Sequence, residues 1–143
     1  MKYYTTDPGG LAYYPLTPTR VLDTRYGTGT RLGRTTPIGQ NKTYDMLAWG
    51  TTTTHDGIVT LPSTAQALVA NFTVARPTAT THLTIYAPPA TLPSTSNLNV
   101  AAGTVVPNLV ITAIGPTGHV NVYNYAGDAP TLADLAGYYA PAS

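Results

Sequence analysis

Side chains able to do acid–base or metal chemistry are few in this chain and widely scattered. The histidines His55, His82 and His119 lack the i, i+2 strand spacing or i, i+4 helix spacing that would bring two of them to one ion. Glutamate is absent, and no local arrangement selects two aspartates as a hydrolytic pair. The sequence also has no Gly-x-Ser-x-Gly elbow, Walker loop or dinucleotide fingerprint. We expect a non-enzymatic protein without metal or cofactor; an aspartate site assembled by the fold is the weakest alternative.

One charged pair has a spacing with a physical consequence. Asp23 and Arg25 stand two residues apart, so both point to the same side of an extended strand. A carboxylate and a guanidinium placed in this way can brace neighbouring loops by charge-assisted hydrogen bonds. We interpret them as a structural ion pair, with a binding role as the alternative. With Arg25, the basic side chains at Arg31, Arg34 and Lys42 lie among glycines and threonines, which is typical of a solvated loop. Contact with phosphate or with an acidic protein surface is the alternative.

Tyrosine is the residue type that the chain offers most freely for recognition. There are 11 tyrosines and one tryptophan, and such rings supply rigid amphipathic surface for sugars or for protein interfaces. Our candidates for binding a protein partner are Tyr3, Tyr4, Tyr13 and Tyr14. Our candidates for stacking on a carbohydrate are Trp49, Tyr123 and Tyr125. A place at the edge of the core is the alternative for each ring.

Composition limits the fold and the partners. A chain of 143 residues suits one domain, and its abundant Thr, Gly, Pro and Tyr favour strands joined by tight turns. Only 9% of residues are charged and the net charge is +1, so we expect no nucleic-acid ligand. Cysteine is absent, which excludes disulfides and thiolate metal sites. No apolar run reaches the length of a membrane helix, so membrane insertion is not expected.

Apolar residues alternate with polar ones in about eight short segments, which predicts an all-β, two-sheet antiparallel sandwich of jelly-roll or related Greek-key type. Leu22 is expected in the core, and the segment 68–74 is apolar on both faces, as in a central strand. Residues 1–12 read as an N-terminal arm, because Asp7-Pro-Gly-Gly10 is turn chemistry, and residues 13–143 as the sandwich.

The connections carry further predictions. A hairpin is expected between 68–74 and 81–86, and a second one around the Gly115-Pro-Thr-Gly118 turn. The proline-rich segment 87–93 interrupts pairing and is interpreted as a connection between the sheets. Residues 131–139 read as a final strand, with a helical turn as the alternative.

Several motifs occur in an order that resembles a known family. They begin with Tyr14-Pro-Leu-Thr-Pro-Thr-Arg-Val-Leu-Asp-Thr-Arg25 and end with Leu132-Ala-Asp-Leu-Ala-Gly-Tyr-Tyr139, with Gly57-Ile-Val-Thr-Leu-Pro62 and Gly118-His-Val-Asn-Val-Tyr-Asn124 between. The chain resembles the "Leu-Asp-Thr-Arg" all-β domains of exported surface proteins and wall-associated enzymes of actinobacteria. The resemblance implies adhesion or wall contact and no particular active site.

Residues 1–10 lack the hydrophobic stretch of a secretion signal, which conflicts with the extracellular location of that family. The explanations are a fragment of a longer exported protein, a mature form, or a protein that leaves the cell by another route, as a bacteriophage structural protein does. We favour the last and expect a virion protein, a capsid decoration or fibre-like module. Its arm would dock on a capsid or tail protein, and copies would form a homo-oligomer. The alternative is a carbohydrate- or cell-wall-binding module, extracellular or wall-associated.

Overall fold

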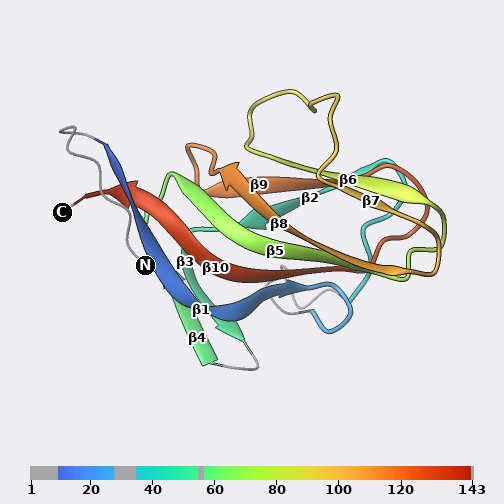
Figure 1. The fold of residues 1–143 in the computed structure, drawn as a ribbon, viewed down its shortest axis with the longest axis horizontal. Helices are drawn as coiled ribbons and strands as arrows, with labels where there is room; N and C mark the ends of the chain where they lie inside the picture. The colour runs from blue at the N-terminus through green and yellow to red at the C-terminus, as the bar shows by residue number, and fades with distance from the viewer. Residues whose placement is uncertain (1–9, 28–34, 55–56, 143) are drawn as a thin grey trace.

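Ten β-strands and no helix make up the part of the chain that the computed structural model describes, residues 10–27, 35–54 and 57–142 (Figure 1). The strands are β1 (Leu11–Asp23), β2 (Lys42–Leu47), β3 (Gly50–Thr54), β4 (Gly57–Leu61), β5 (Ala67–Ala75), β6 (Thr81–Tyr86), β7 (Leu98–Val100), β8 (Val105–Ala113), β9 (His119–Asn124) and β10 (Thr131–Pro141). Within these residues, no helix is long and apolar enough to span a membrane.

Eight of the strands form two antiparallel four-stranded sheets. One sheet has the order β1-β10-β5-β8 and the other the order β2-β9-β6-β7, while β3 and β4 form a separate hairpin (Figure 1). The chain changes sheet between β1 and β2, β5 and β6, β7 and β8, β8 and β9, and β9 and β10. It also changes sheet between β2 and β5, where the β3–β4 hairpin is inserted. This strand order is that of a jelly roll, with the hairpin inserted before β5. The predicted all-β sandwich is confirmed.

Both hairpin predictions are wrong. Strands β5 and β6 lie in different sheets, and so do β8 and β9. The turn between β8 and β9 forms as expected, since the Gly118 N–H donates to Gly115 O at 2.8 Å and the Gly115 N–H to His119 O at 2.9 Å. The turn joins strands that face each other across the core, because a short turn can link two layers as well as two neighbours.

The segment 87–93 does not connect the sheets either. Strands β6 and β7 on its two sides pair with each other in one sheet, with Leu83 opposite Leu98. Prolines are tolerated there because the segment lies outside the ladder. The final segment forms β10, so the helical alternative is excluded.

The arm predicted for residues 1–12 is too long by two residues at its inner end. Leu11 and Ala12 belong to β1, where they lie opposite Pro141 and Ala140, and Ala12 is fully buried. Backbone pairing with the last strand holds this segment in the sheet, although Leu11 and Ala12 show no alternating pattern. Residues 1–9 of the predicted arm lie outside the described residues.

The core lies between the two sheets and follows the predicted alternation. Leu22 and Phe72 are fully buried, and Val110 of β8 and Val122 of β9 belong to the same cluster. The second face of β5 is covered less evenly than predicted: Val69 is buried, whereas the other outward residues of the strand are only half-buried. The outer face of this sheet is therefore accessible at β5 and beyond it at β8.

A single buried amide joins the loops at one end of the sandwich. Asn124 is fully buried, and its Nδ2 donates to the backbone oxygens of Ile38 and Gly127, each at 2.8 Å. Its Oδ1 accepts from the Thr81 hydroxyl at 2.6 Å, and that hydroxyl accepts from the Ala126 N–H at 2.8 Å. Because a buried amide needs such partners, Asn124 fixes three separate segments relative to β9.

Candidate interaction surfaces

The side chains on the outer side of β8 form an exposed apolar surface. They belong to alternate residues that face away from the core, namely Val105, Pro107, Leu109, Ile111 and Ala113, which we call the β8 face. The exposed fractions are 54% for Val105, 59% for Leu109 and 63% for Ile111. The register continues this surface onto β5, where Val69 lies opposite Ile111. Contiguous exposed apolar surface of this kind marks interaction sites.

No charged side chain interrupts the sequence around the β8 face. Residues 77–127 contain no Asp, Glu, Lys or Arg. Edge strands of soluble proteins are usually protected by charged residues, proline or a covering segment. In β8 only Pro107 serves that purpose. A surface that is apolar, uncharged and at a sheet edge is suited to contact with another protein surface.

The tyrosines predicted to bind a partner are held by intramolecular contacts. Tyr13 of β1 and Tyr139 of β10 have ring centroids 5.1 Å apart, and Tyr14 stacks on Tyr138 at 5.2 Å. The register places Tyr139 opposite Ala67, on the outer side of the sheet that also carries the β8 face. These cross-strand pairs stabilise the pairing of β1 with β10. The sequence alone did not reveal that these two strands are neighbours. The other candidates, Tyr3 and Tyr4, lie outside the described residues.

Asp23 and Arg25 form the predicted ion pair. Arg25 Nε and Nη2 donate to the two Asp23 carboxylate oxygens, both at 3.0 Å, and the Arg25 N–H donates to Oδ1 at 3.0 Å. Arg20 adds to this group: its Nη1 lies 3.6 Å from Asp23 Oδ2, and its Nε donates to Asp134 Oδ1 of β10 at 2.9 Å. The sequence analysis missed Arg20 and Asp134, because their contact requires the pairing of the first and last strands.

The electrostatics of this group follow from its burial. The Asp23 residue is 1% exposed, and burial alone would raise the pKa of its carboxyl. The hydrogen bonds from the Arg25 side chain and backbone, with the charges of Arg25 and Arg20, outweigh burial and hold the pKa below its usual value. The bond to Asp23 raises the pKa of Arg25 in return. Both oxygens of the buried Asp23 carboxylate accept hydrogen bonds from Arg25, which supports the structural interpretation.

The three residues proposed to stack on a carbohydrate do not form one site. Trp49 lies against Gly118, before β9 begins, whereas Tyr125 follows the end of β9, so the strand separates them. Trp49 donates its indole N–H to Ala65 O at 2.8 Å. Tyr123 is 9% exposed and donates its hydroxyl to Asn41 Oδ1 at 2.8 Å. Trp49 and Tyr123 thus serve packing rather than an exposed binding site. The sequence did not show this, because the burial of a ring depends on tertiary contacts.

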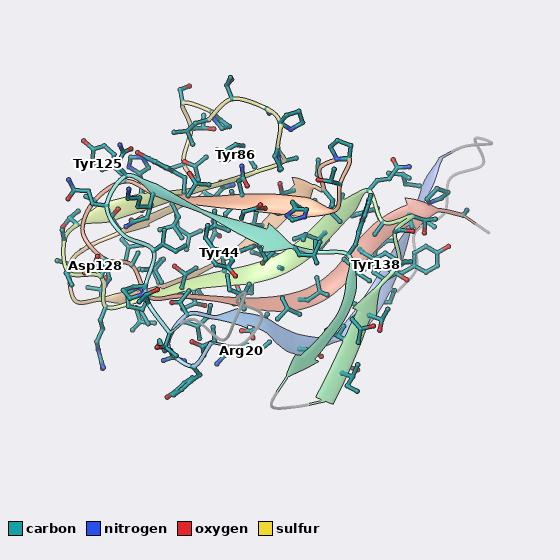
Figure 2. The ribbon with its side chains drawn as sticks, turned by 180° about the vertical axis from the view of Figure 1, so that it is seen from behind. Arg20, Tyr44, Tyr86, Tyr125, Asp128 and Tyr138 are labelled. Atoms are coloured by element: carbon teal, nitrogen blue, oxygen red, sulfur yellow. The ribbon has the colours of Figure 1, made fainter. Side chains whose placement is uncertain are left out.

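Tyr125 keeps an accessible ring. It is 56% exposed and stacks on His82, with ring centroids 4.6 Å apart and planes inclined by 15° (Figure 2 labels Tyr125). The pair offers a flat aromatic surface at one end of the β2-β9-β6-β7 sheet. This is the part of the predicted carbohydrate site that the geometry retains.

The histidines lie apart from one another. His119 of β9 contacts Asp45 of β2, with Nδ1 2.6 Å from Oδ1, and His82 stacks on Tyr125 as described. Within the described part of the chain, no group of three His, Asp or Glu side chains is arranged to hold a metal ion. His55 lies outside the described residues.

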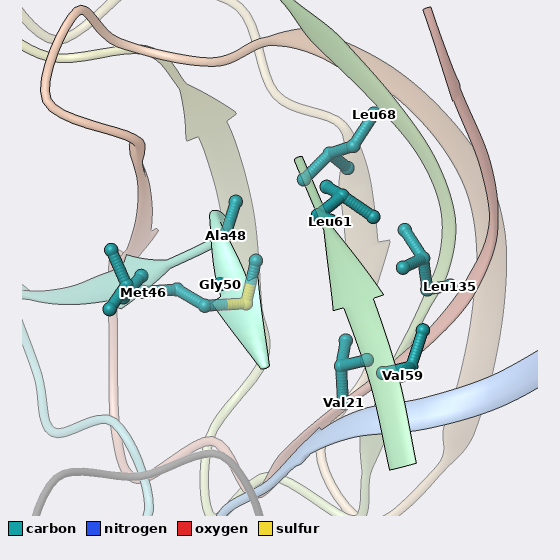
Figure 3. A pocket seen from close by; sticks show the side chains of 9 residues that line it. Val21, Met46, Ala48, Gly50, Val59, Leu61, Leu68 and Leu135 are labelled. Atoms are coloured by element: carbon teal, nitrogen blue, oxygen red, sulfur yellow. The ribbon is translucent and has the colours of Figure 1, made fainter. Parts of the chain in front are cut away.

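An apolar cavity lies where the β3–β4 hairpin meets the sandwich (Figure 3). Its volume is about 20 Å³, close to that of one water molecule by this measure. The lining residues are Val21, Met46, Leu47, Ala48, Gly50, Val59, Leu61, Leu68 and Leu135, and none of them is titratable. The cavity is a gap in packing and offers no group for catalysis or for orienting a polar ligand.

Comparison with known proteins gives no assignment: no known family matches the chain, and none of the curated proteins matches it. The likeness to the "Leu-Asp-Thr-Arg" domains stays a prediction. The function has to be argued from the surfaces themselves.

Proposed function

We propose that the protein is a non-catalytic structural module, a virion protein of the capsid-decoration or fibre-like kind. The observation that carries the proposal is the β8 face, an uncharged apolar surface on the outside of a jelly roll. Jelly rolls build viral capsid domains as well as lectins. Apolar surface free of charge is typical of the centre of protein interfaces, where charged residues are depleted.

The contacts between the two ends of the described chain support a role in display. The first and last strands of the described sandwich are tied together by the two tyrosine pairs and by the Arg20–Asp134 bond. In the proposed role, the β1-β10-β5-β8 sheet turns toward the assembly and the β2-β9-β6-β7 sheet faces outward. The N-terminal arm adds contacts to a capsid or tail protein, as an extended segment does when it pairs with a neighbouring sheet.

Incorporation into particles tests this proposal. Virions assembled with the full chain and with a chain lacking residues 1–9 are purified and probed with an antibody to the sandwich. The deletion leaves β1 whole, so the melting temperature stays at the wild-type value while the truncated protein is lost from particles. Absence of the full-length protein from purified particles would overturn the proposal. Normal incorporation of the truncated form would show that residues 1–9 are not needed for docking.

A carbohydrate-binding module is the second candidate function, and the exposed Tyr125–His82 stack is the observation that favours it. A glycan array or a pull-down with cell-wall material tests it directly. If sugars stack on this pair, Tyr125→Ala abolishes retention. Tyr26→Ala is the matched control, since Tyr26 is 75% exposed and lies elsewhere, beside Arg25. Indifference of the wild-type protein to all glycans would rule this function out.

A further inference from the structure

We propose that Tyr125, His82 and Asn99 form a subsite for a neutral sugar, in which Tyr125 supplies the stacking surface and Asn99 selects among sugars by their hydroxyl groups. The inference rests on the carbohydrate-binding function given above as the second candidate, and it adds a specificity residue and the charge of the ligand. Three features carry it: the alignment of the side chains, the hydrogen-bonding groups that they leave open, and the composition of the surrounding sheet face.

The three side chains lie in one row across the outer side of the β2-β9-β6-β7 sheet. Asn99 of β7 is directly opposite His82 of β6, and the Tyr125 N–H donates to His82 O at 3.1 Å, so Tyr125 lies on the other side of His82. Their neighbours along the chain, Leu83 and Leu98, belong to the core, and the row therefore points away from it. With strands about 4.8 Å apart, the row is about 10 Å long, which is longer than a single sugar ring.

Contacts inside the chain hold the row in position. The His82 ring stacks on Tyr125 with centroids 4.6 Å apart and meets the Tyr123 ring at 6.4 Å, inclined by 49°. Because His82 covers one face of Tyr125 and the residue is still 56% exposed, the opposite face of the ring is open to a ligand. The Ser96 hydroxyl donates to Asn99 Oδ1 at 3.1 Å and orients the amide. Groups that are already in place lose little freedom when a ligand binds.

The row offers hydrogen-bonding groups that the described part of the chain does not use. The ring nitrogens of His82, the Tyr125 hydroxyl and Asn99 Nδ2 make no hydrogen bond with another described residue. A sugar ring has a face of C–H groups and an edge of hydroxyls. Its face can stack on Tyr125 while its hydroxyls accept from Asn99 Nδ2 and exchange hydrogen bonds with His82. Aromatic rings with a few fixed polar groups are typical of sites for small ligands.

The rest of this sheet face favours a neutral glycan over a protein or a nucleic acid. Its outward side chains alternate with the core residues of the four strands and are Thr43, Asp45, Leu47, His82, Thr84, Tyr86, Asn99, His119, Asn121 and Tyr123. Leu47 is the one aliphatic side chain among them, whereas the centre of a protein interface is rich in apolar side chains. None of them is Lys or Arg, and Asp45 repels anions, so phosphates and acidic sugars are disfavoured.

A glycan array that carries neutral and acidic glycans is the first test. We expect the wild-type chain to retain neutral glycans. Retention of no glycan would overturn the inference together with the carbohydrate-binding function. Retention of acidic glycans alone would overturn the inference and leave that function standing.

Affinity measurements with the best retained neutral glycan test the role of Asn99. Asn99→Ala should weaken binding at least about tenfold and reduce the preference for this glycan over the other neutral glycans, a change in selectivity that loss of stability would not produce. Asn121→Ala is the matched control, because Asn121 lies on the same face four residues before Tyr125, about 13 Å along the strand, and it should bind like the wild type. Unchanged affinity and selectivity of Asn99→Ala would overturn the inference, and near-ultraviolet circular dichroism verifies that each variant is folded.

Chemical-shift mapping locates the sugar independently of any substitution. Isotope-labelled wild-type protein is titrated with the same glycan, and the largest shifts of backbone amides are expected at His82, Asn99 and Tyr125. Shifts centred on the β8 face or around Trp49 would place the sugar elsewhere and contradict the assignment, although the protein would still bind carbohydrate.

Discussion

Tyr13 of β1 lies across the backbone of Gly137 in β10, with its ring in the space that a side chain at 137 would occupy. The Tyr13 hydroxyl also donates to the neighbouring Ala136 O at 3.3 Å. A glycine in the interior of a strand weakens the sheet, and an aromatic ring from the adjacent strand that covers it restores packing. The pair explains why glycine stands in the middle of the last strand.

Gly137→Ala should therefore destabilise the sandwich. The added methyl group displaces the Tyr13 ring, and overpacking of this kind costs about 1–3 kcal/mol in the free energy of unfolding. Urea denaturation measures the loss. Gly39→Ala is the control, because a Cβ there comes no closer than 3.5 Å to its neighbours, and its effect should stay under about 1 kcal/mol. Equal stability of Gly137→Ala and wild type would contradict the reading of the Tyr13 contact.

Asp23→Asn should lower stability at neutral pH by about 1–3 kcal/mol, because the Arg25 and Arg20 groups lose their buried anion. Asp45→Asn is the control: its carboxylate is 57% exposed beside His119, and such pairs contribute about 1 kcal/mol or less. Thermal and urea unfolding of both variants gives the comparison. A larger loss in Asp45→Asn would contradict the structural role of Asp23.

The same carboxylate predicts a dependence on pH. Because the pKa of Asp23 is lower in the folded chain than in the unfolded one, its contribution is complete above the unfolded value of about 4 and disappears as the pH falls through the folded value. The difference in unfolding free energy between wild type and Asp23→Asn should shrink over that acidic range. Urea titrations at a series of pH values measure it, and a constant difference would refute the assignment.

Asn124→Leu should cost about 2–4 kcal/mol, because the backbone oxygens of Ile38 and Gly127 lose their donor in a buried site. Asn99→Ala is the matched control, since Asn99 is exposed on β7 and should change stability by about 0.5 kcal/mol or less. Chemical denaturation compares the two. Similar effects from both substitutions would show that the Asn124 contacts do not hold the loops.

Trp49→Phe should reduce stability by about 1–2 kcal/mol, since the Ala65 carbonyl loses the indole donor and Gly118 loses part of its cover. It should leave any binding to glycans unchanged, because the ring serves packing. Because Trp49 is the one tryptophan of the chain, the variant has no tryptophan fluorescence, and circular dichroism is used to follow its unfolding. Loss of glycan retention with full stability would reverse that interpretation.

The positions of the strands could be predicted from the sequence better than the pairing of each strand with its neighbours in a sheet. The segment 68–74 was predicted as a central strand with both faces buried, and it forms β5; its core face, with Phe72, is buried, whereas its outer face is only partly covered. The Gly115–Gly118 turn was also recognised, but its glycines satisfy the same local geometry whether the flanking strands lie side by side or in opposite sheets. Pairing of β1 with β10 leaves no local signal, since its contacts join the two ends of the chain.

Site residues were predictable only where the contact is local. Asp23 and Arg25 are two residues apart, and their bond follows from strand geometry. The burial of Tyr123 and the use of the Trp49 N–H depend on residues far along the chain, Asn41 and Ala65. Residues 109–114 are apolar apart from Thr112, so the sequence does not distinguish their two faces, and only the fold shows that Leu109 and Ile111 point outward.

The pairing of Leu11 with Pro141 has a consequence for biosynthesis. The first strand emerges from the ribosome long before its hydrogen-bonding neighbour is made, and β5 lacks its neighbour β10 over the same period. Loop-closure entropy across nearly the whole chain must be overcome before this sheet is complete, which makes folding slow for a protein of this size. The nascent chain cannot complete this sheet until β10 has left the ribosome, because β10 lies between β1 and β5.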